Sequence, residues 1–244
     1  MPRFFTKPEN FNNDTVTIAG ADAFHIARSL RMAVGDHITV CDAEGFEYTC
    51  VLRKIRDDLC ECEILEKAPS KTESPTNITL FMAYPKGDKL EFIIQKAVEL
   101  GVNKIVPFES SFCVKRPRQD KAEKQNSRLT RIAEEAAKQC GRARLAEVSQ
   151  PINYGEMLKS ASRSDLVLFC YEGDGTLSLK DVLTQNPDKK SIAVIVGCEG
   201  GFSKQEAEKA KESGFMLVNL GPRILRCETA PIYALSAISF AYEL

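Results

Sequence analysis

A change of hydrophobic pattern near residue 70 most constrains the fold of this 244-residue chain. Before that point, short segments alternate in polarity and are separated by turns that contain Gly or Asp, which is typical of strands in a small β-barrel. The clearest of these segments are Ile38–Cys41, Glu47–Leu52 and Cys60–Leu65. Residues 67–76 are polar, include two prolines and show no periodicity, which indicates a linker. We therefore expect a β-barrel domain over residues 1–70 and a second domain over residues 75–244.

After the linker, apolar segments with the length of strands alternate with longer helical segments. We expect strands at 78–84, 103–108, 166–170, 192–196 and 216–220, and helices at 88–100, 122–140 and 229–243. This order predicts an α/β fold with a parallel sheet and helices on both of its faces. Such sheets bind ligands at the carboxyl ends of their strands.

The composition is that of a globular protein, with 43% hydrophobic and 27% charged residues. No apolar run approaches the roughly 20 residues of a membrane span, and residues 1–10 lack the apolar segment of a secretory signal. The nine cysteines and two histidines show no spacing typical of a metal site. We expect reduced thiols, no bound metal and a cytoplasmic location.

The charges are distributed unevenly, although the net charge is only −1. Residues 112–144 contain ten Lys or Arg and four acidic residues, a net charge of +6. Such a block is typical either of a surface that binds phosphates or of a solvated helix face with its flanking loop. The block alone does not decide between these two interpretations.

The segment after the expected strand 192–196 has the composition of a loop that binds a ligand. It reads Gly-Cys-Glu-Gly-Gly at 197–201, and Ser203 with Glu206 predicts a capping box at the start of a helix. The glycines permit close approach of the backbone to a ligand, and the helix N-terminus adds a partial positive charge. The pattern matches neither Gly-x-Gly-x-x-Gly nor a P-loop. A tight turn that binds nothing is the alternative.

A second loop, at residues 221–227, follows the expected strand 216–220 and reads Gly-Pro-Arg-Ile-Leu-Arg-Cys. Loops that follow neighbouring parallel strands lie at the same edge of the sheet, so the two loops are expected to meet. Together they bring two arginines and two acids, Glu199 and Glu228, to one site. The alternative is that Arg226 forms a salt bridge to one of these acids and only holds the loop in place.

These two motifs, 197–203 and 220–230, strongly resemble those of the RsmE family. Residues 1–5, 25–36 and 86–101 also resemble it, so the likeness covers most of the chain. The family consists of S-adenosylmethionine-dependent methyltransferases of the SPOUT superfamily that methylate N3 of a uridine in small-subunit (16S) ribosomal RNA. The resemblance implies a trefoil-knotted, parallel-sheet methyltransferase domain, an N-terminal β-barrel of PUA or OB type, and a homodimer. It also implies ribosomal RNA or the small ribosomal subunit as the partner, with no membrane.

The same resemblance, combined with the chemistry of methyl transfer, gives the expected site residues. We expect Arg226 to stabilise the uracil anion, with Glu199 or Glu228 orienting it or taking its proton. The residues expected to bind the cofactor are Cys170, Tyr171, Gly197, Glu199, Gly200, Gly201, Leu220, Gly221, Ile224, Leu225 and Arg226. The residues expected to bind RNA are Arg3, Arg28, Arg31, Lys86, Arg128, Arg131, Arg142 and Arg144.

Three residues in or near these motifs depart from the family pattern. Cys198 stands where Pro is usual, Cys227 where Thr is usual, and Phe112 where Arg is common. Two rival functions remain open on the sequence alone. One is another nucleotide-dependent α/β enzyme such as an oxidoreductase, and the other is a non-catalytic RNA-binding assembly factor.

Overall fold

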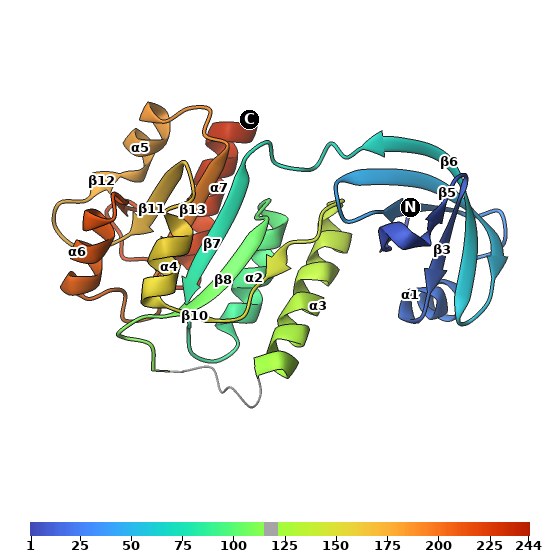
Figure 1. Ribbon diagram of the computed structural model, residues 1–244, viewed down its shortest axis with the longest axis horizontal. Helices are drawn as coiled ribbons and strands as arrows, with labels where there is room; N and C mark the ends of the chain where they lie inside the picture. Colours follow the sequence, from blue (N-terminus) through green and yellow to red (C-terminus); the bar gives the residue numbers. More distant parts are fainter. Residues whose placement is uncertain (115–121) are drawn as a thin grey trace. The chain divides into compact units, whose positions relative to one another are not determined.

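The computed structural model describes residues 1–114 and 122–244 (Figure 1). Four basic residues of the +6 block, at 115, 116, 118 and 121, lie outside the described residues. The chain forms two compact units. The first comprises Met1–Glu73 and Ala137–Leu145, and the second comprises Ser74–Ala136 and Ala146–Leu244. Residues 137–145 therefore pack with the first unit, although the sequence predicted them as part of the second domain.

The first unit is built on a six-stranded sheet in the order β1-β4-β5-β6-β3-β2. Its strands are β1 (Arg3–Phe5), β2 (Phe11–Asn12), β3 (Thr15–Ala19), β4 (His37–Cys41), β5 (Phe46–Ile55) and β6 (Leu59–Pro69). All neighbours pair antiparallel except β1 and β4. Alternate residues of these strands, such as Val16, Ile18 and Leu52, form a buried core. Strand β6 continues to Pro69, so the segment predicted as a linker begins within a strand.

The second unit contains a parallel sheet in the order β10-β8-β7-β13-β11-β14-β12, with β9 pairing with β8. Its strands are β7 (Asn77–Ala83), β8 (Lys104–Glu109), β9 (Glu147–Val148), β10 (Ile152–Asn153), β11 (Leu166–Cys170), β12 (Leu177–Ser178), β13 (Ser191–Val196) and β14 (Met216–Asn219). The central strands are almost wholly buried, as expected of a sheet covered on both faces. The prediction of an α/β fold with a parallel sheet is confirmed.

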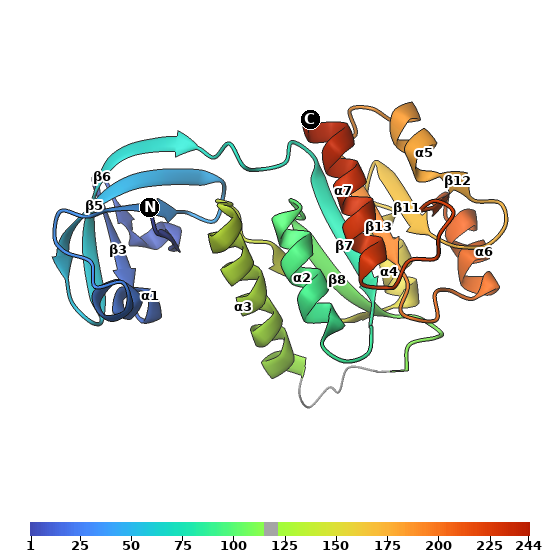
Figure 2. The same cartoon turned by 180° about the vertical axis from the view of Figure 1, so that it is seen from behind.

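Helices cover both faces of this sheet: α2 and α7 lie on one face and α4 lies on the other (Figures 1 and 2). The α-helices of the described residues are α1 (Ala21–Phe24), α2 (Lys89–Glu99), α3 (Ala122–Cys140), α4 (Tyr154–Ala161), α5 (Leu179–Gln185), α6 (Lys204–Glu212) and α7 (Thr229–Glu243). No helix among the described residues is long and apolar enough to cross a membrane.

The strand order places three loops together. Strand β11 pairs with β13 on one side and with β14 on the other. The register aligns Leu168 with both Val194 and Met216, so the three strands run in the same direction at similar height. The loops that follow β11, β13 and β14 consequently leave the sheet at one edge.

Candidate active site

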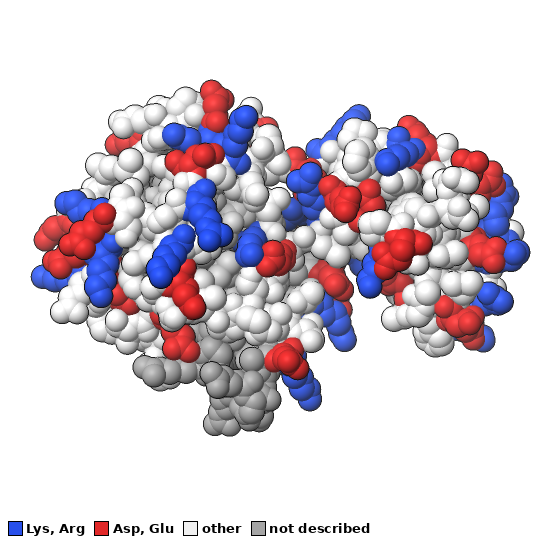
Figure 3. All heavy atoms as spheres, in the orientation of Figure 1, with Lys and Arg blue, Asp and Glu red and all other residues white. Residues whose placement is uncertain are grey.

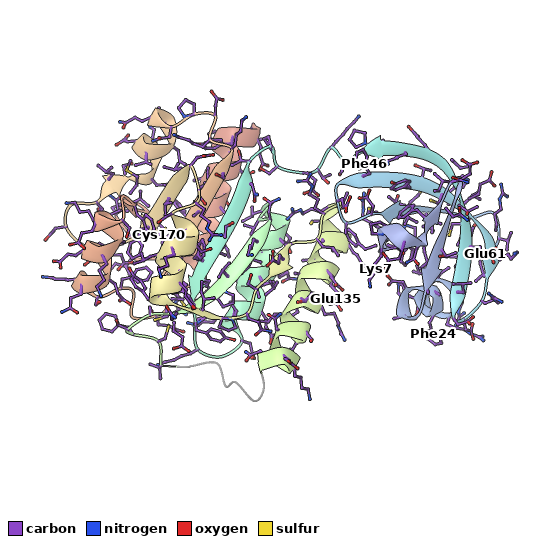
Figure 4. All side chains as sticks on the ribbon, in the orientation of Figure 1. Lys7, Phe24, Phe46, Glu61, Glu135 and Cys170 are labelled. Atoms are coloured by element: carbon purple, nitrogen blue, oxygen red, sulfur yellow. The ribbon has the colours of Figure 1, made fainter. Side chains whose placement is uncertain are left out.

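These three loops enclose a cavity of about 480 Å³. This volume lies within the range of about 300–1,000 Å³ that is usual for small-molecule sites. Every residue predicted to bind the cofactor lines this cavity except Gly221. Gly221 instead lines a larger cavity of about 740 Å³ next to α5 and α7. No residue of the Gly197–Gly201 loop lines that cavity. Cys170, at the end of β11, is labelled in Figure 4.

Two glycines of the loop after β13 are required by close packing. A Cβ atom on Gly197 would lie 2.9 Å from the Cα atom of Gly201, and one on Gly200 would lie 2.8 Å from the Cβ atom of Phe112. Gly201 has a φ of +65°, a backbone conformation that residues other than glycine rarely adopt. The loop is therefore a tight turn that lines the cavity largely with backbone.

The capping box at the start of α6 holds the far end of this loop. The Ser203 hydroxyl accepts a hydrogen bond from the Glu206 backbone N–H, and the Ser203 N–H donates to the Glu206 carboxylate at 2.9 Å. Glu206 is buried, and its other oxygen accepts a hydrogen bond from the Ser111 N–H at 2.8 Å. The prediction of a capping box is confirmed, and Glu206 also ties α6 to the segment after β8.

Lys89, at the start of α2, lies at the site but was not among the predicted site residues. Its ammonium group lies 3.0 Å from Glu199 Oε1 and 3.2 Å from Glu228 Oε2. The Lys86 backbone N–H also donates to Glu199 Oε1, at 3.0 Å. The resemblance of residues 86–101 to the family was the only signal in the sequence that could have drawn attention to Lys89.

Both carboxylates have a pKa below the ordinary value of a glutamate. Burial raises the pKa of Glu199, but hydrogen bonds from its own N–H and from Lys89 and Lys86 outweigh burial and leave the pKa below its ordinary value. Burial likewise raises the pKa of Glu228, and hydrogen bonds from its own N–H, Cys227 and Lys89 bring it below its ordinary value. The pKa of Lys89 is raised, chiefly by its hydrogen bond to Glu199.

Arg226 is exposed beside the cavity. Within residues 1–114 and 122–244, its guanidinium forms no ion pair with Glu199 or Glu228, since both acids bind Lys89. Its backbone carbonyl accepts hydrogen bonds from the N–H groups of Thr229 and Ala230, which begin α7. The salt bridge to Glu199 or Glu228 that was the alternative for Arg226 is therefore not observed among the described residues, and the role of Arg226 stays a prediction.

The residues predicted to bind RNA fall into three groups. Arg142 is only 2% exposed and bonds to Glu73 at 2.9 Å, and Arg3 is largely buried and bonds to Glu47 at 3.1 Å. Four others are exposed and have a partner: Arg28 with Asp57, Arg128 with Glu91, Arg131 with Glu135, and Arg144 with the carbonyl of Glu44. Arg31 and Lys86 are exposed, and no side-chain ion pair involves them within the described part of the chain.

Acidic side chains lie among the basic ones on the face of each unit shown in Figure 3. On that face, neither unit taken by itself shows a surface of basic side chains alone. Arg142 and Arg3 are the clearest departures from the prediction. The Arg142 guanidinium stabilises the first unit, because its loss would leave the Glu73 carboxylate, whose side chain is only 10% exposed, without a cation.

All three departures from the family pattern have defined contacts. The Cys227 thiol donates to Glu228 at 3.2 Å and lies 3.6 Å from the Lys89 ammonium, so it keeps a hydrogen-bonding role. Cys198 is buried in contact with the Ser110 hydroxyl at 3.8 Å. Phe112, which is 48% exposed, packs against Gly200.

Comparison with known proteins agrees with this architecture. Residues 72–239 match the family model of the RNA methyltransferase domain, and residues 18–65 match that of the RNA methyltransferase PUA domain. The fold and site thus define an RNA methyltransferase. The chain is 36% identical to the ribosomal RNA small subunit methyltransferase E of Bacillus subtilis (strain 168), over 100% of this chain and 98% of the relative. The chain belongs to the ribosomal RNA small subunit methyltransferase E family.

Two further relatives support this assignment. The corresponding protein of Synechocystis is 33% identical, over 99% of this chain and 78% of the relative. A crystal structure of the family member from Neisseria gonorrhoeae, bound to S-adenosyl methionine, is 35% identical with a TM-score of 0.86. The similarity to that structure covers 98% of this chain and 97% of the other.

Proposed function

We propose that this protein transfers the methyl group of S-adenosylmethionine to N3 of a uridine in small-subunit (16S) ribosomal RNA. The observation that carries the proposal is the cavity formed where the loops after β11, β13 and β14 meet. The relative from Neisseria gonorrhoeae has the same fold and binds S-adenosyl methionine.

The residues around the cavity fit this cofactor. The tightly packed Gly197–Gly201 turn offers backbone groups, and Leu220, Ile224 and Leu225 offer apolar surface. Glu199 adds a carboxylate. We propose that these residues, with Cys170, Tyr171 and Gly221, hold the cofactor. When bound, S-adenosylmethionine supplies a methyl group on a positively charged sulfur. A nucleophile in line with the carbon–sulfur bond can take the methyl group, and the sulfur is the leaving group.

Arg226 is the residue we propose as catalytic. Uracil N3 becomes nucleophilic as it loses its proton to water, and negative charge then spreads to the two flanking oxygens. A guanidinium that forms no ion pair with Glu199 or Glu228 is available to stabilise that charge. The target base must be single-stranded or flipped out of its helix to reach the site.

Glu199 and Glu228 are poor candidates for the general base. A base works best when its pKa lies near the working pH, and both carboxylates have lowered pKa values. They also lie against Lys89 rather than Arg226. We therefore propose that Glu199, which lines the cavity, helps to shape it and that Glu228 pairs with Lys89, in place of their expected role as orienting groups or proton acceptors.

For RNA binding we retain the exposed basic residues and exclude Arg3 and Arg142. The retained residues are Arg28, Arg31 and Arg144 in the first unit and Lys86, Arg128 and Arg131 in the second. Phosphate can reach their side chains: that of Arg128 is 67% exposed, for example, compared with 16% for Arg3 and 3% for Arg142. The family model over residues 18–65, a PUA domain of RNA methyltransferases, supports a role for the first unit in RNA binding.

We also propose that the protein is a cytoplasmic homodimer with a trefoil knot in its second unit. The apolar helix α7 supports the dimer, because Ala234 and Ile238 are buried whereas Phe240 is 73% exposed. Strand β13 lies between β7 and β11 in the sheet, although it follows both of them in the chain, and this order is compatible with a knot. Phe240→Asp should convert the dimer to a monomer in size-exclusion chromatography with light scattering. A wild-type monomer would contradict the dimer.

Calorimetry with S-adenosylmethionine, NAD and ATP tests the choice of cofactor. The proposal predicts binding of S-adenosylmethionine alone. Binding of NAD or ATP would instead support another nucleotide-dependent enzyme. Binding of none of the three would support a non-catalytic assembly factor.

A further inference from the structure

Lys89 joins three elements of the second unit at one atom. It begins α2, Glu199 belongs to the loop after β13, and Glu228 lies at the start of α7. The ammonium is therefore a direct link between the two cofactor-binding loops that the sequence motifs define. Cys227, which precedes Glu228, also lies 3.6 Å from the Lys89 ammonium, although it is 138 residues away in sequence.

Without the Lys89 ammonium, the carboxylates of Glu199 and Glu228 would lie close together with no cation between them. Both carboxylates have an oxygen within 3.2 Å of the same nitrogen, so they are close neighbours. Two ionised carboxylates at such proximity repel each other, and the pKa of one of them rises unless a cation lies between them. The neighbouring Cys227 thiol does not share the charge, because burial raises its pKa to about 12.

Other charged groups are present around the link. Those that line the cavity or flank the start of α2 are Glu172, Arg223, Arg226, Lys86, Asp88 and Glu91. Glu91 is paired with Arg128, and Lys86 contributes its backbone N–H to Glu199. Lys89 is the only one of these basic side chains that contacts both Glu199 and Glu228 among the described residues.

We propose that Lys89 is a positioning residue for methyl transfer, which holds the two cofactor-binding loops together by neutralising the repulsion between Glu199 and Glu228. The inference rests on the proposed function. Lys89 acts through the two carboxylates and not on the reacting atoms.

The same helix offers a matched control. Lys96 lies on α2, and its side chain is 32% exposed compared with 34% for Lys89. Lys96 pairs with Glu99 three residues further along the helix, so its ion pair connects no separate elements. Replacing either lysine by glutamine removes one positive charge from α2, but only Lys89→Gln releases the two loops.

The experiment measures the dissociation constant of S-adenosylmethionine by calorimetry between about pH 8 and about pH 5.5, as the ratio of each variant to wild type. The ratio cancels the ionisation of the cofactor itself. Lys89→Gln should weaken binding about tenfold or more at the higher pH, the factor that corresponds to a pKa change of one unit. Binding should recover as the pH falls, because protonation of the carboxylate with the raised pKa removes the repulsion. Lys96→Gln should remain near wild type, and Lys89→Arg, which keeps the positive charge, should bind more tightly than Lys89→Gln at the higher pH.

A second substitution separates charge from packing. Adding Glu228→Gln to Lys89→Gln removes one of the two repelling charges, so binding should recover at the higher pH and lose its pH dependence. Circular dichroism checks that each variant is folded. If the single variant Lys89→Gln is unfolded, recovery of folding in the double variant also supports the proposal. Unchanged binding by Lys89→Gln would overturn the proposal, as would weakened binding that neither acid nor Glu228→Gln restores. Failure of the wild type to bind S-adenosylmethionine would instead refute the proposed function.

Discussion

Arg142 in the first unit and Arg226 in the second were both expected to act on ligands, yet the structure gives them opposite surroundings. Arg142 is 2% exposed, and two of its nitrogens donate to Glu73 Oε2 at 2.9 and 3.3 Å. Arg226 is exposed beside the cavity, and the acids Glu199 and Glu228 form their ion pairs with Lys89 instead. A guanidinium that satisfies a buried carboxylate maintains the fold, whereas one without such a partner beside a cavity is available to a ligand.

The largest effect is expected on stability in the first unit. Arg142→Met should lower the free energy of unfolding by about 3–5 kcal/mol, because it leaves the buried Glu73 carboxylate without its cation. Urea denaturation followed by circular dichroism measures this loss. The double variant Arg142→Met, Glu73→Met should recover part of it, since no charge then remains buried. A single variant as stable as wild type would show that Arg142 is not a structural residue.

The next effect is expected on catalysis in the second unit. Arg226→Ala should reduce the rate of methyl transfer about 10²–10³-fold at saturating substrate, the usual cost of removing one group that stabilises an anion. Its melting temperature should stay close to that of wild type, because the side chain is exposed. Arg163→Ala is the control, since Arg163 is exposed and precedes β11 at the opposite edge of the sheet. An unchanged rate in Arg226→Ala would remove Arg226 from the mechanism.

A smaller effect is expected from crowding the cofactor loop. The methyl group of Gly197→Ala would lie within about 3 Å of the Gly201 backbone, which cannot move aside as a side chain can. The resulting strain should weaken S-adenosylmethionine binding by about 1–3 kcal/mol, measured by calorimetry. Gly155→Ala on α4 is the matched control, because its nearest contact would be 3.4 Å from a side-chain oxygen. Equal binding by both variants would argue against the loop as the cofactor site.

The smallest effect separates a paired from an unpaired arginine in the first unit. Arg31→Ala should reduce the slope of RNA affinity against salt concentration by about one, the value for one lost phosphate contact. Arg28→Ala should reduce it less, because Asp57 already neutralises part of that charge at 2.6 Å. Fluorescence anisotropy at several salt concentrations provides both slopes. A larger change for Arg28 would reverse this ranking.

The sequence predicted the sheet of the second unit well, because its buried strands are short apolar runs between turns. The expected strand 166–170 coincides with β11, and the ends of helix α3 match the expected 122–140. Helices α4 and α5 were missed, since each spans only two turns and carries a short apolar pattern. Cofactor loops could be placed together because loops after neighbouring parallel strands share one edge.

The contacts that assign roles to single residues could not be predicted. Glu73 lies 69 residues from Arg142 in sequence, so the burial of that pair is a product of the tertiary fold. Lys89 likewise meets Glu199 and Glu228 only after α2, β13 and α7 have packed. Sequence motifs therefore identified the cavity, whereas the division between structural and available charges required the structure.

The most direct test of the proposed uridine-N3 methylation is mass-spectrometric mapping of methylated uridines in small-subunit ribosomal RNA. RNA from a strain that lacks this protein would be incubated with the purified protein and S-adenosylmethionine. We predict that the wild type and Arg163→Ala restore methylation at N3 of a single uridine and that Arg226→Ala does not restore it at the same rate. Methylation at another atom or another kind of nucleotide, or none at all, would contradict the account.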